Sequence, residues 1–343
     1  MKNIIGFLPK EFEEEMIEAG EKAYRARQII SWIYKKRAFD FQLMTDLPQT
    51  LIKKLAKHFE VTDLLLEQTV VSRTDGAEKF LWKLSDENLI ESVLIRAKER
   101  NTICVSTQVG CKTRCLFCES GKNGFKRDLT DGEIVGQIMG TIRETKCDIN
   151  NVVFMGMGEP LDNYKNLERA IQIINHPDCL NIGARKMTVS TCGIVPGIRQ
   201  LSELGIQVEL AISLHAGNDE LRNELVPINR KYPIAQLIEA CQFFSKITGR
   251  KITIEYAVIK GKNDSGKDAR EVAGIAKEIN AKVNLIGCNK TTKIQENACT
   301  THDVERFRDL LLAKGVPVTV RRSRGSDIFA ACGQLSAHKV KNG

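Results

Sequence analysis

Three closely spaced cysteines are the residues of this sequence most suited to chemistry. Cys111, Cys115 and Cys118 stand in the segment GCKTRCLFC, with three and then two residues between them. Thiolates at this spacing can bind one face of a [4Fe-4S] cubane and leave its fourth iron without a protein ligand. Such an open iron can chelate the amino and carboxylate groups of S-adenosylmethionine, and an electron from the cluster can then break a carbon–sulfur bond. The spacing therefore predicts reductive cleavage of S-adenosylmethionine.

A structural zinc site is the main alternative for these thiols. Zinc in such sites takes four ligands, and no nearby histidine or cysteine completes a spaced quartet, because Cys104 is expected to lie across a strand. Unligated thiols are a further alternative. The spacing favours the cluster over both.

Polar residues that follow expected strands would complete a pocket beside the cluster. In FMGMGEPL, Gly158 lets the backbone approach a ligand, and Glu159 supplies a carboxylate for an ammonium group. Further polar residues end later strands: Ser190, Ser213, His215 and Asn289. Each of these could instead be a hydrogen-bonded core residue, which for His215 alone is the commoner role.

The elements that must position these residues alternate in type from Thr102 onward. The β-rich runs are TICVSTQ, NVVFMGM, KMTVSTCG, QVELAISLH, KITIEYAVI, KVNLIGC and VPVTVRR. The helices expected between them cover residues 131–144, 166–175, 234–246, 267–279 and 302–314. Alternation of this kind predicts parallel strands in a barrel or an open doubly wound sheet, whose sites lie at the carboxyl ends of the strands.

The first hundred residues have a different pattern. YRARQIISWIYKKR predicts a helix with Tyr24, Ile29, Ile30, Ile33 and Tyr34 near one face, and a second helix is expected over 48–58. The basic residues of both helices could be a solvated face or a phosphate-contacting surface. EKFLWKLS and LIESVLIRA then predict a hairpin. We expect three segments: 1–60, mainly helical; 61–101, a β-hairpin linker or extension; and 102–343, the barrel.

Composition narrows the class of protein. The chain has 343 residues, of which 42% are apolar, and a net charge of +8, which favours a polyanionic partner without requiring one. We find no signal peptide and no membrane span, so a cytoplasmic location without membrane contact is expected. Eleven scattered cysteines are then expected to serve as metal ligands, catalysts or core residues rather than as a disulfide framework.

Taken together, these motifs resemble one enzyme family. VSTQ after Cys104, GCKTRCLFC, FMGMGEPL, VSTCG, AISLH, VPINRKYPI and RRSRGSDIFAACGQL are similar to segments of the radical S-adenosylmethionine adenine methyltransferases known as RlmN and Cfr, and most closely to the RlmN branch. The similarity covers nearly the whole chain. It implies an α/β fold: a partial (β/α)6 TIM-like barrel of the radical SAM type, with a small, mainly helical N-terminal domain that contacts RNA and a C-terminal loop that carries a catalytic cysteine.

The resemblance also implies roles for individual residues. The cluster would bind Cys111, Cys115 and Cys118. Contacts with S-adenosylmethionine would come from Gly158, Glu159, Ser190, Ser213, Leu214, His215 and Asn289. Cys332 matches the family's methyl-carrying cysteine, Cys104 its resolving thiol and Glu91 its proton acceptor.

The chemistry implied by the family needs both of these thiols. Cys332 takes a methyl group from one S-adenosylmethionine, and cleavage of a second gives a radical that abstracts hydrogen from that methyl group. The methylene radical adds to the adenine ring and links RNA to Cys332. After loss of the ring proton, Cys104 can release the product by forming a disulfide with Cys332. Taken alone, Cys104 would more commonly be a buried strand cysteine, and Cys332 could be an inert loop thiol.

Partners follow from the same resemblance. The substrate implied is an adenosine of 23S rRNA, with tRNA as a possible second substrate, and it would enter as an unpaired or flipped base. Basic residues are candidates for phosphate contacts: Lys126, Arg127, Arg321, Arg322 and Arg324. An electron donor such as flavodoxin or ferredoxin and a monomeric enzyme are expected.

Two departures from the family pattern leave rival functions open. The asparagine that family members flank with prolines stands here between Gly287, Cys288 and Lys290, and Glu119 replaces a usually small residue. The alternatives to methylation at carbon 2 are methylation at carbon 8, which would confer antibiotic resistance, and a catalytically silent Fe-S protein that binds RNA.

Overall fold

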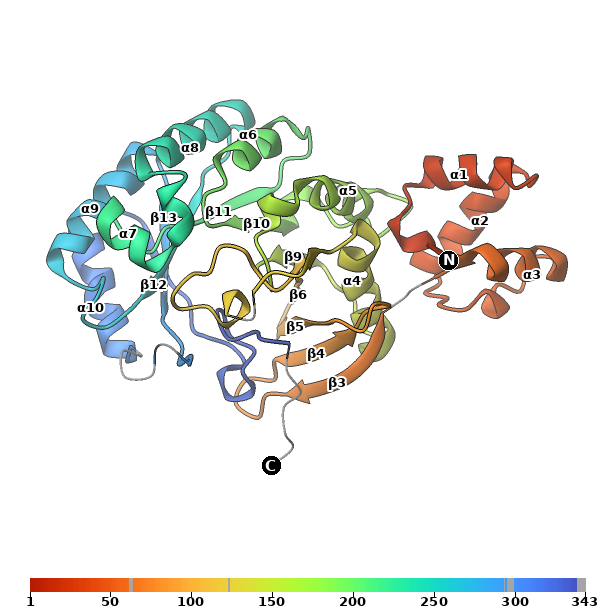
Figure 1. Ribbon diagram of the computed structural model, residues 1–343, viewed down its shortest axis with the longest axis horizontal. Helices are drawn as coiled ribbons and strands as arrows, with labels where there is room; N and C mark the ends of the chain where they lie inside the picture. Colours follow the sequence, from red (N-terminus) through yellow and green to blue (C-terminus); the bar gives the residue numbers. More distant parts are fainter. Residues whose placement is uncertain (62–63, 123, 293, 295–298, 338–343) are drawn as a thin grey trace.

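A single mixed sheet organises the chain. The computed structural model describes residues 1–61, 64–122, 124–292, 294 and 299–337. Within this part, ten strands pair in the order β14-β13-β12-β11-β10-β9-β6-β5-β4-β3 (Figure 1). The strands of this sheet are β3 (Leu65–Val71), β4 (Glu78–Lys83), β5 (Leu89–Ala97), β6 (Arg100–Cys104), β9 (Asn151–Phe154), β10 (Met187–Thr191), β11 (Glu209–Ser213), β12 (Thr253–Val258), β13 (Lys282–Gly287) and β14 (Val318–Val320).

In this sheet, β6 and the strands from β9 to β14 are parallel, as the alternating pattern predicts. Helices follow most of them and cover the outer face of the curved sheet (Figure 1). They are α4 (Asp131–Thr145), α5 (Tyr164–Asn175), α6 (Val195–Glu203), α7 (Asp219–Leu225), α8 (Ile234–Thr248), α9 (Gly266–Glu278) and α10 (Thr301–Leu312). Together they form the predicted partial α/β barrel, with β14 as a short further strand beside β13. Helices α6 and α7 are additional to those predicted from the sequence.

Side-chain caps fix the start of several of these helices. Thr130, Ser265 and Thr300 each accept a hydrogen bond from the backbone N–H three residues later, and an acidic side chain at that position binds back to the cap. These capping boxes satisfy backbone donors that a helix end would otherwise leave unpaired. They therefore fix the residue at which α4, α9 and α10 each begin.

Strands β3, β4 and β5 add an antiparallel extension to the same sheet. The predicted hairpin of β4 and β5 is present, and the missed strand β3 pairs on its outer side. Strand β5 pairs antiparallel with β6, so the extension continues into the parallel barrel. Trp82 of β4 lies against α4, where a Cβ at Gly140 would come 2.9 Å from its ring.

The N-terminal helices pack at one end of the barrel beside α4 and α5 (Figure 1). They are α1 (Pro9–Glu18), α2 (Ala23–Tyr34) and α3 (Gln49–His58), and the short strands β1 (Lys2–Asn3) and β2 (Phe59–Glu60) pair next to them. The predicted face of α2 is present, with Ile29, Ile30, Ile33 and Tyr34 buried on it. The placement of Tyr24 on that face is wrong, because 45% of its surface is exposed.

An arginine network joins this region to the barrel. Arg169 of α5 donates to both carboxylate oxygens of Glu11, at 2.7 and 2.8 Å, and to the carbonyl of Gly6 at 3.1 Å. Apolar residues from the N-terminal helices and from the barrel also belong to one continuous core. In the described part of the chain, no helix combines the length and the apolar character needed to cross a membrane.

Candidate active site

The three predicted cluster cysteines lie around one cleft at the carboxyl ends of the parallel strands. The loop after β6 carries Cys111, Cys115 and Cys118, and all three border a cleft that encloses about 990 Å³, open solvent included. Cys111 and Cys115 are buried, whereas Cys118 is partly exposed. The spacing read from the sequence therefore brings the three thiols to the edge where such folds hold their active sites.

The donor set fits a [4Fe-4S] cluster. Thr113 Oγ1 lies 2.9 Å from Cys111 Sγ and 3.7 Å from Cys115 Sγ, so one hydroxyl contacts both thiols. All three cysteines are free rather than joined in disulfides, and are therefore available as ligands. Within the described residues, no three His, Cys, Asp or Glu side chains are gathered as tightly as one metal ion requires. A cubane does not require this, because each of its thiolates binds a different iron.

The predicted cofactor-binding residues surround the same cleft. Ser190 at the end of β10 and Ser213 at the end of β11 have their hydroxyl oxygens 3.3 Å apart. The other predicted residues that border the cleft are Gly158, Glu159, His215 and Asn289. Leu214 is not among the bordering residues; its side chain is buried and its N–H donates to the carbonyl of Glu255.

Gly158 and Glu159 have structural partners that the sequence did not reveal. Gly158 has a φ of +97°, and a Cβ there would lie 2.5 Å from the side chain of Gln108. Glu159 is buried, and its two carboxylate oxygens accept N–H groups from Leu161 at 3.1 Å and Cys192 at 2.7 Å. Burial raises the pKa of Glu159, and these hydrogen bonds offset only part of that rise. Its contact with an ammonium group stays a prediction.

His215 is a buried neutral donor. Its Nδ1 accepts the N–H of Ala257 at 2.9 Å, so the proton of the neutral ring belongs on Nε2. Burial, with a smaller contribution from the charge of Arg222, lowers the pKa of His215 to about 3. The ring also packs edge-on against Phe117 of the cysteine loop, with the ring centroids 4.5 Å apart.

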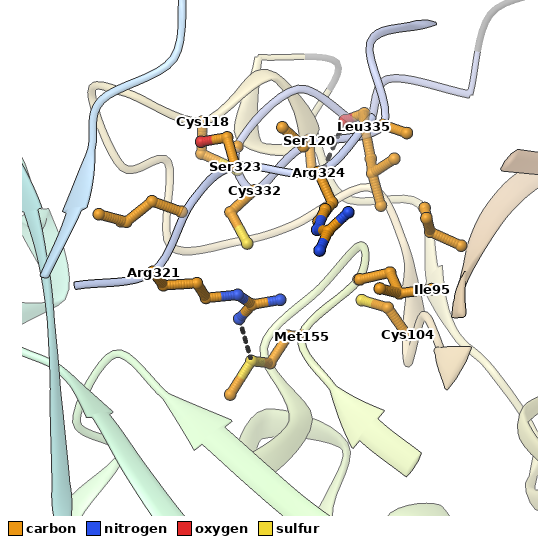
Figure 2. A pocket seen from close by; sticks show the side chains of 16 residues that line it. Ile95, Cys104, Cys118, Ser120, Met155, Arg321, Ser323, Arg324, Cys332 and Leu335 are labelled. Carbon is orange, nitrogen blue, oxygen red and sulfur yellow. Dashed lines mark hydrogen bonds between the residues drawn. The ribbon is translucent and has the colours of Figure 1, made fainter. Parts of the chain in front are cut away.

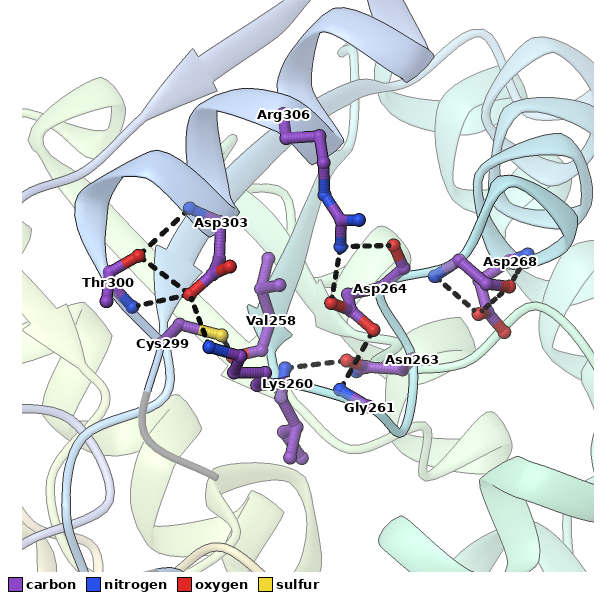
Figure 3. Close-up of polar contacts among 12 residues, drawn as sticks. Val258, Lys260, Gly261, Asn263, Asp264, Asp268, Cys299, Thr300, Asp303 and Arg306 are labelled. Atoms are coloured by element: carbon purple, nitrogen blue, oxygen red, sulfur yellow. Dashed lines mark hydrogen bonds and ion pairs between the residues drawn. The ribbon is translucent and has the colours of Figure 1, made fainter. Parts of the chain in front are cut away.

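A residue of the loop between β12 and α9 forms hydrogen bonds that hold the backbone at His215. Asn263 is fully buried, and its amide donates to the carbonyls of His215 and Ala257, both at 2.8 Å. Its side-chain oxygen accepts from Ile259 N–H at 2.6 Å. Figure 3 shows the neighbouring contacts of this loop, in which Asp264 accepts from Gly261 N–H and from the guanidinium of Arg306. The sequence analysis missed Asn263.

A second, smaller cavity lies next to the cleft and contains the other two predicted cysteines. Cys104, at the end of β6, and Cys332, in the C-terminal segment, both line it. Figure 2 shows both side chains pointing into the space that Arg321 and Arg324 border. Cys332 and Cys118 line both cavities, so Cys332 stands where the two meet.

The two thiols differ in their surroundings. Cys104 is buried, and burial raises its pKa to about 12, whereas Cys332 is exposed. Both are free, so the structure contains no disulfide between them. Arg321 lies close to both, and negative charge on Cys332 and Glu255 raises the pKa of its guanidinium.

Glu91 lies outside both cavities. Its carboxylate is fully buried, 3.0 Å from Lys79 Nζ, and it accepts the N–H groups of Ser336 at 2.8 Å and Ala337 at 3.0 Å. In this structure Glu91 therefore anchors the segment that follows Cys332. Its role as proton acceptor stays a prediction.

The two departures from the family pattern meet at one junction. Glu119 N–H donates to Gly333 O at 2.8 Å, while the Glu119 carboxylate accepts the N–H of Thr292. Asn289 donates to Cys332 O at 3.1 Å. The unusual glutamate thus ties the cysteine loop both to the loop that carries Asn289 and to the Cys332 segment.

Two of the basic residues proposed for phosphates are engaged elsewhere. Arg127 forms two bonds of 2.8 Å with Glu133 and one of 2.6 Å with Asp86, so carboxylates occupy its guanidinium in this structure, and its contact with phosphate stays a prediction. Lys126 donates to the side chain of Asn88. Arg322 and Arg324 are exposed.

Known proteins share these features. Residues 105–273 match the family model described as "Radical SAM superfamily", and residues 2–61 match "Ribosomal RNA large subunit methyltransferase N-terminal domain". Over 342 residues the chain is 43% identical to "Probable dual-specificity RNA methyltransferase RlmN" of Clostridium novyi (strain NT), covering 100% of both chains. It is 44% identical to the protein of the same name from Thermotoga sp. (strain RQ2), covering 100% of this chain and 99% of that protein.

A solved structure agrees with this result. The crystal structure of a radical SAM methyltransferase from Sphaerobacter thermophilus matches with a TM-score of 0.95 and 42% identity, covering 98% of this chain and all of that one. The barrel and its cysteine loop thus define a radical SAM protein. Full-length identity above 40% shows the particular group: the chain belongs to the RlmN family.

The contrast between Cys332 and Cys104 is testable by alkylation. In native protein at pH 7.5, we expect iodoacetamide to modify Cys332 at least about tenfold faster than Cys104, because a buried thiol with a raised pKa offers little accessible thiolate. Peptide mass spectrometry over a time course measures both rates. If Cys104 and Cys332 react at equal rates in native protein, the buried position of Cys104 is contradicted. Slower modification than in urea shows that the protein was folded during that measurement.

The low pKa of His215 makes stability depend on pH. Because its pKa of about 3 in the folded state lies below the ordinary value of 6.5, the unfolded state takes up the proton first as pH falls. Stability should therefore decrease as pH falls from 6.5 toward 3, by about 2 kcal/mol at pH 5 from this residue alone. Urea unfolding of cluster-free protein at pH 7 and pH 5 measures the loss.

His215→Asn is the matched variant, because its Oδ1 can still accept the Ala257 N–H and asparagine tolerates the positive φ of 61°. It should lose less stability than the unchanged protein over the same pH range. An equal loss in both proteins would show that His215 is not the group responsible.

Proposed function

We propose that this chain methylates carbon 2 of an adenosine in RNA by radical S-adenosylmethionine chemistry, with 23S rRNA as one substrate and tRNA as a second. The observation that carries the proposal is the position of Cys332, which borders both the cluster cleft and the cavity of Cys104. A methyl group on its sulfur would lie between a source of radicals and a second thiol. The dual-specificity RNA methyltransferases named above support the choice of RNA.

The residues of the cleft would have different roles in binding the cluster and S-adenosylmethionine. Cys111, Cys115 and Cys118 would hold a [4Fe-4S] cluster, and Ser190, Ser213 and the Nε2–H of His215 offer hydrogen bonds to S-adenosylmethionine. When bound, the cluster and this cofactor would together supply a carbon-centred radical able to abstract a hydrogen atom. Cys332, whose S-methyl group would give up that hydrogen atom, stands at the exposed edge of the same cleft.

The second cavity would complete the reaction. Once the methylene carbon joins RNA to Cys332, the adduct must pass its unpaired electron to an electron carrier and lose the ring proton before the carbon–sulfur bond breaks. Cys104 would then attack the sulfur of Cys332 and form a transient disulfide, while the freed carbon takes up a proton. A thiol reductant must reduce this disulfide before the next turnover. Because burial raises the pKa of Cys104 to about 12, this thiol must lose its proton during the step. We assign the ring proton to Glu91, as the family pattern implies.

The proposal extends to partners. Contact between residues 1–60 and RNA is supported by the match of residues 2–61 to the model described as "Ribosomal RNA large subunit methyltransferase N-terminal domain". The net charge of +8 of the whole chain also favours a polyanionic partner, because phosphates attract positive charge. We further propose that a small electron carrier, flavodoxin or ferredoxin, reduces the cluster, that two molecules of S-adenosylmethionine are used per methylation, and that a cytoplasmic monomer is the active form.

Removing either catalytic thiol should give a distinct result. Cys332→Ala removes the atom that carries the methyl group, so methylation should fall below about one-thousandth of the original rate. Cys104→Ala keeps that atom but removes the release step, so RNA should accumulate as a covalent adduct with the protein. Anaerobic assays with reconstituted protein, read by gel electrophoresis and nucleoside mass spectrometry, measure both.

Cys147→Ala is the control, because Cys147 lines neither cavity. It should methylate normally and give 2-methyladenosine. A product of 8-methyladenosine would replace the carbon 2 proposal by carbon 8 methylation. Normal turnover by Cys104→Ala without any adduct would refute the release role, and a wild-type protein that forms no 5′-deoxyadenosine would indicate a silent RNA-binding protein.

A further inference from the structure

A fourth cysteine lies against the cluster loop. Cys192, which follows β10, has its Sγ 3.6 Å from the Sγ of Cys115, within reach of an S–H···S hydrogen bond. It also borders the cluster cleft. No local motif links the two cysteines, because Cys192 lies 77 residues after Cys115.

The backbone of Cys192 is held from both sides by buried charged groups. Its N–H donates to Glu159 Oε2 at 2.7 Å, and its carbonyl accepts from the guanidinium of Arg222 at 2.7 Å. Arg222 is fully buried and also donates to the carbonyls of Leu214 and Ser213. Glu159 and Arg222, which bind backbone groups at the ends of β10 and β11, therefore fix the backbone of Cys192 and the position of its thiol beside Cys115.

The direction of the hydrogen bond follows from iron binding. A cysteine that binds iron does so as a thiolate, so a ligated Cys115 can only accept. Thr113 has one hydroxyl proton, and its Oγ1 is 2.9 Å from Cys111 Sγ but 3.7 Å from Cys115 Sγ. The nearer sulfur takes that proton, which leaves Cys192 as the side-chain donor to Cys115.

We propose that Cys192 is a positioning residue that donates a hydrogen bond to the cluster ligand Cys115 and thereby raises the reduction potential of the cluster. Reduction adds negative charge to the cluster and its sulfurs, and a donor stabilises the more negative state more strongly. The inference rests on the proposed cluster at Cys111, Cys115 and Cys118. It does not depend on RNA or on methyl transfer.

The test compares variants that separate the donor from its volume. Cys192→Ala removes the donor, whereas Cys192→Ser keeps an O–H donor in nearly the same space. Cys179→Ala is the control, because Cys179 is a buried cysteine that borders neither cavity. The midpoint potential of each reconstituted holoprotein is measured by a redox titration followed by electron paramagnetic resonance, without RNA.

At a fixed potential we expect Cys192→Ala to lower the ratio of reduced to oxidised cluster roughly tenfold, which is about 59 mV for a one-electron couple. Cys192→Ser should stay within about twofold of the unchanged protein, and Cys179→Ala should match it. Equal shifts in the Ala and Ser variants, or none in either, would overturn the inference.

The outcome separates this inference from the proposed function. A wild-type protein that assembles no cluster overturns both. A normal cluster whose potential ignores Cys192→Ala overturns the hydrogen-bond role alone. The expected shift in a protein that never methylates RNA supports the role of Cys192 and removes the proposed methyltransferase activity.

Discussion

The docking of the C-terminal segment on the cysteine loop is the contact on which the site depends. Gly333 O accepts the N–H of Glu119, and Leu335 O accepts the hydroxyl of Ser120 at 2.7 Å. Gly333 has a φ of +83°, and a Cβ there would lie 2.9 Å from Phe117 O. Only a residue without a side chain allows this approach, and the approach brings Cys332 to the edge of the cluster cleft.

Buried charges hold the two sides of this contact. Arg222 and Glu159 bind backbone groups at the ends of β10 and β11, while Lys79 and Glu91 lie under the chain that follows Cys332. A buried charge is tolerated only when it is paired or fully hydrogen-bonded. Each of these residues therefore fixes the backbone it touches, and the reactive side chains are positioned by residues that do not themselves react.

Much of the barrel was predictable because its local signals agree with the fold. Helices such as α4, α9 and α10 begin at capping residues, and the parallel strands are short β-rich runs between them. The misses have physical causes. Helix α7 has seven residues, too few to show a helical period. Strand β3 is the outer strand of the extension and has no fully buried residue, so its sequence lacks the regular alternation of apolar and polar residues that marks a half-buried strand.

The candidate site likewise combines features that the local sequence reveals with features that it does not. The spacing of Cys111, Cys115 and Cys118 is local, so the sequence reveals it, and the strand ends place Ser190 and Ser213 correctly in the cleft. Cys192, Arg222 and Asn263 were missed because their partners are distant in sequence: Cys192 meets Cys115, Arg222 binds Cys192 O, and Asn263 binds His215 O. Contacts of this kind depend on how loops meet, which no local pattern encodes.

Glu91 shows how the two kinds of information must be combined. The family pattern predicts that Glu91 accepts the ring proton. In this structure, however, its Oε2 accepts two backbone N–H groups of the chain after Cys332, and Lys79 lies beside Oε1. A carboxylate enclosed in this way cannot also meet an adenine ring in the cavity of Cys104. If Glu91 accepts the ring proton, the segment at Ser336 and Ala337 must first leave it. Anchoring that segment and accepting the proton are then successive roles of one carboxylate.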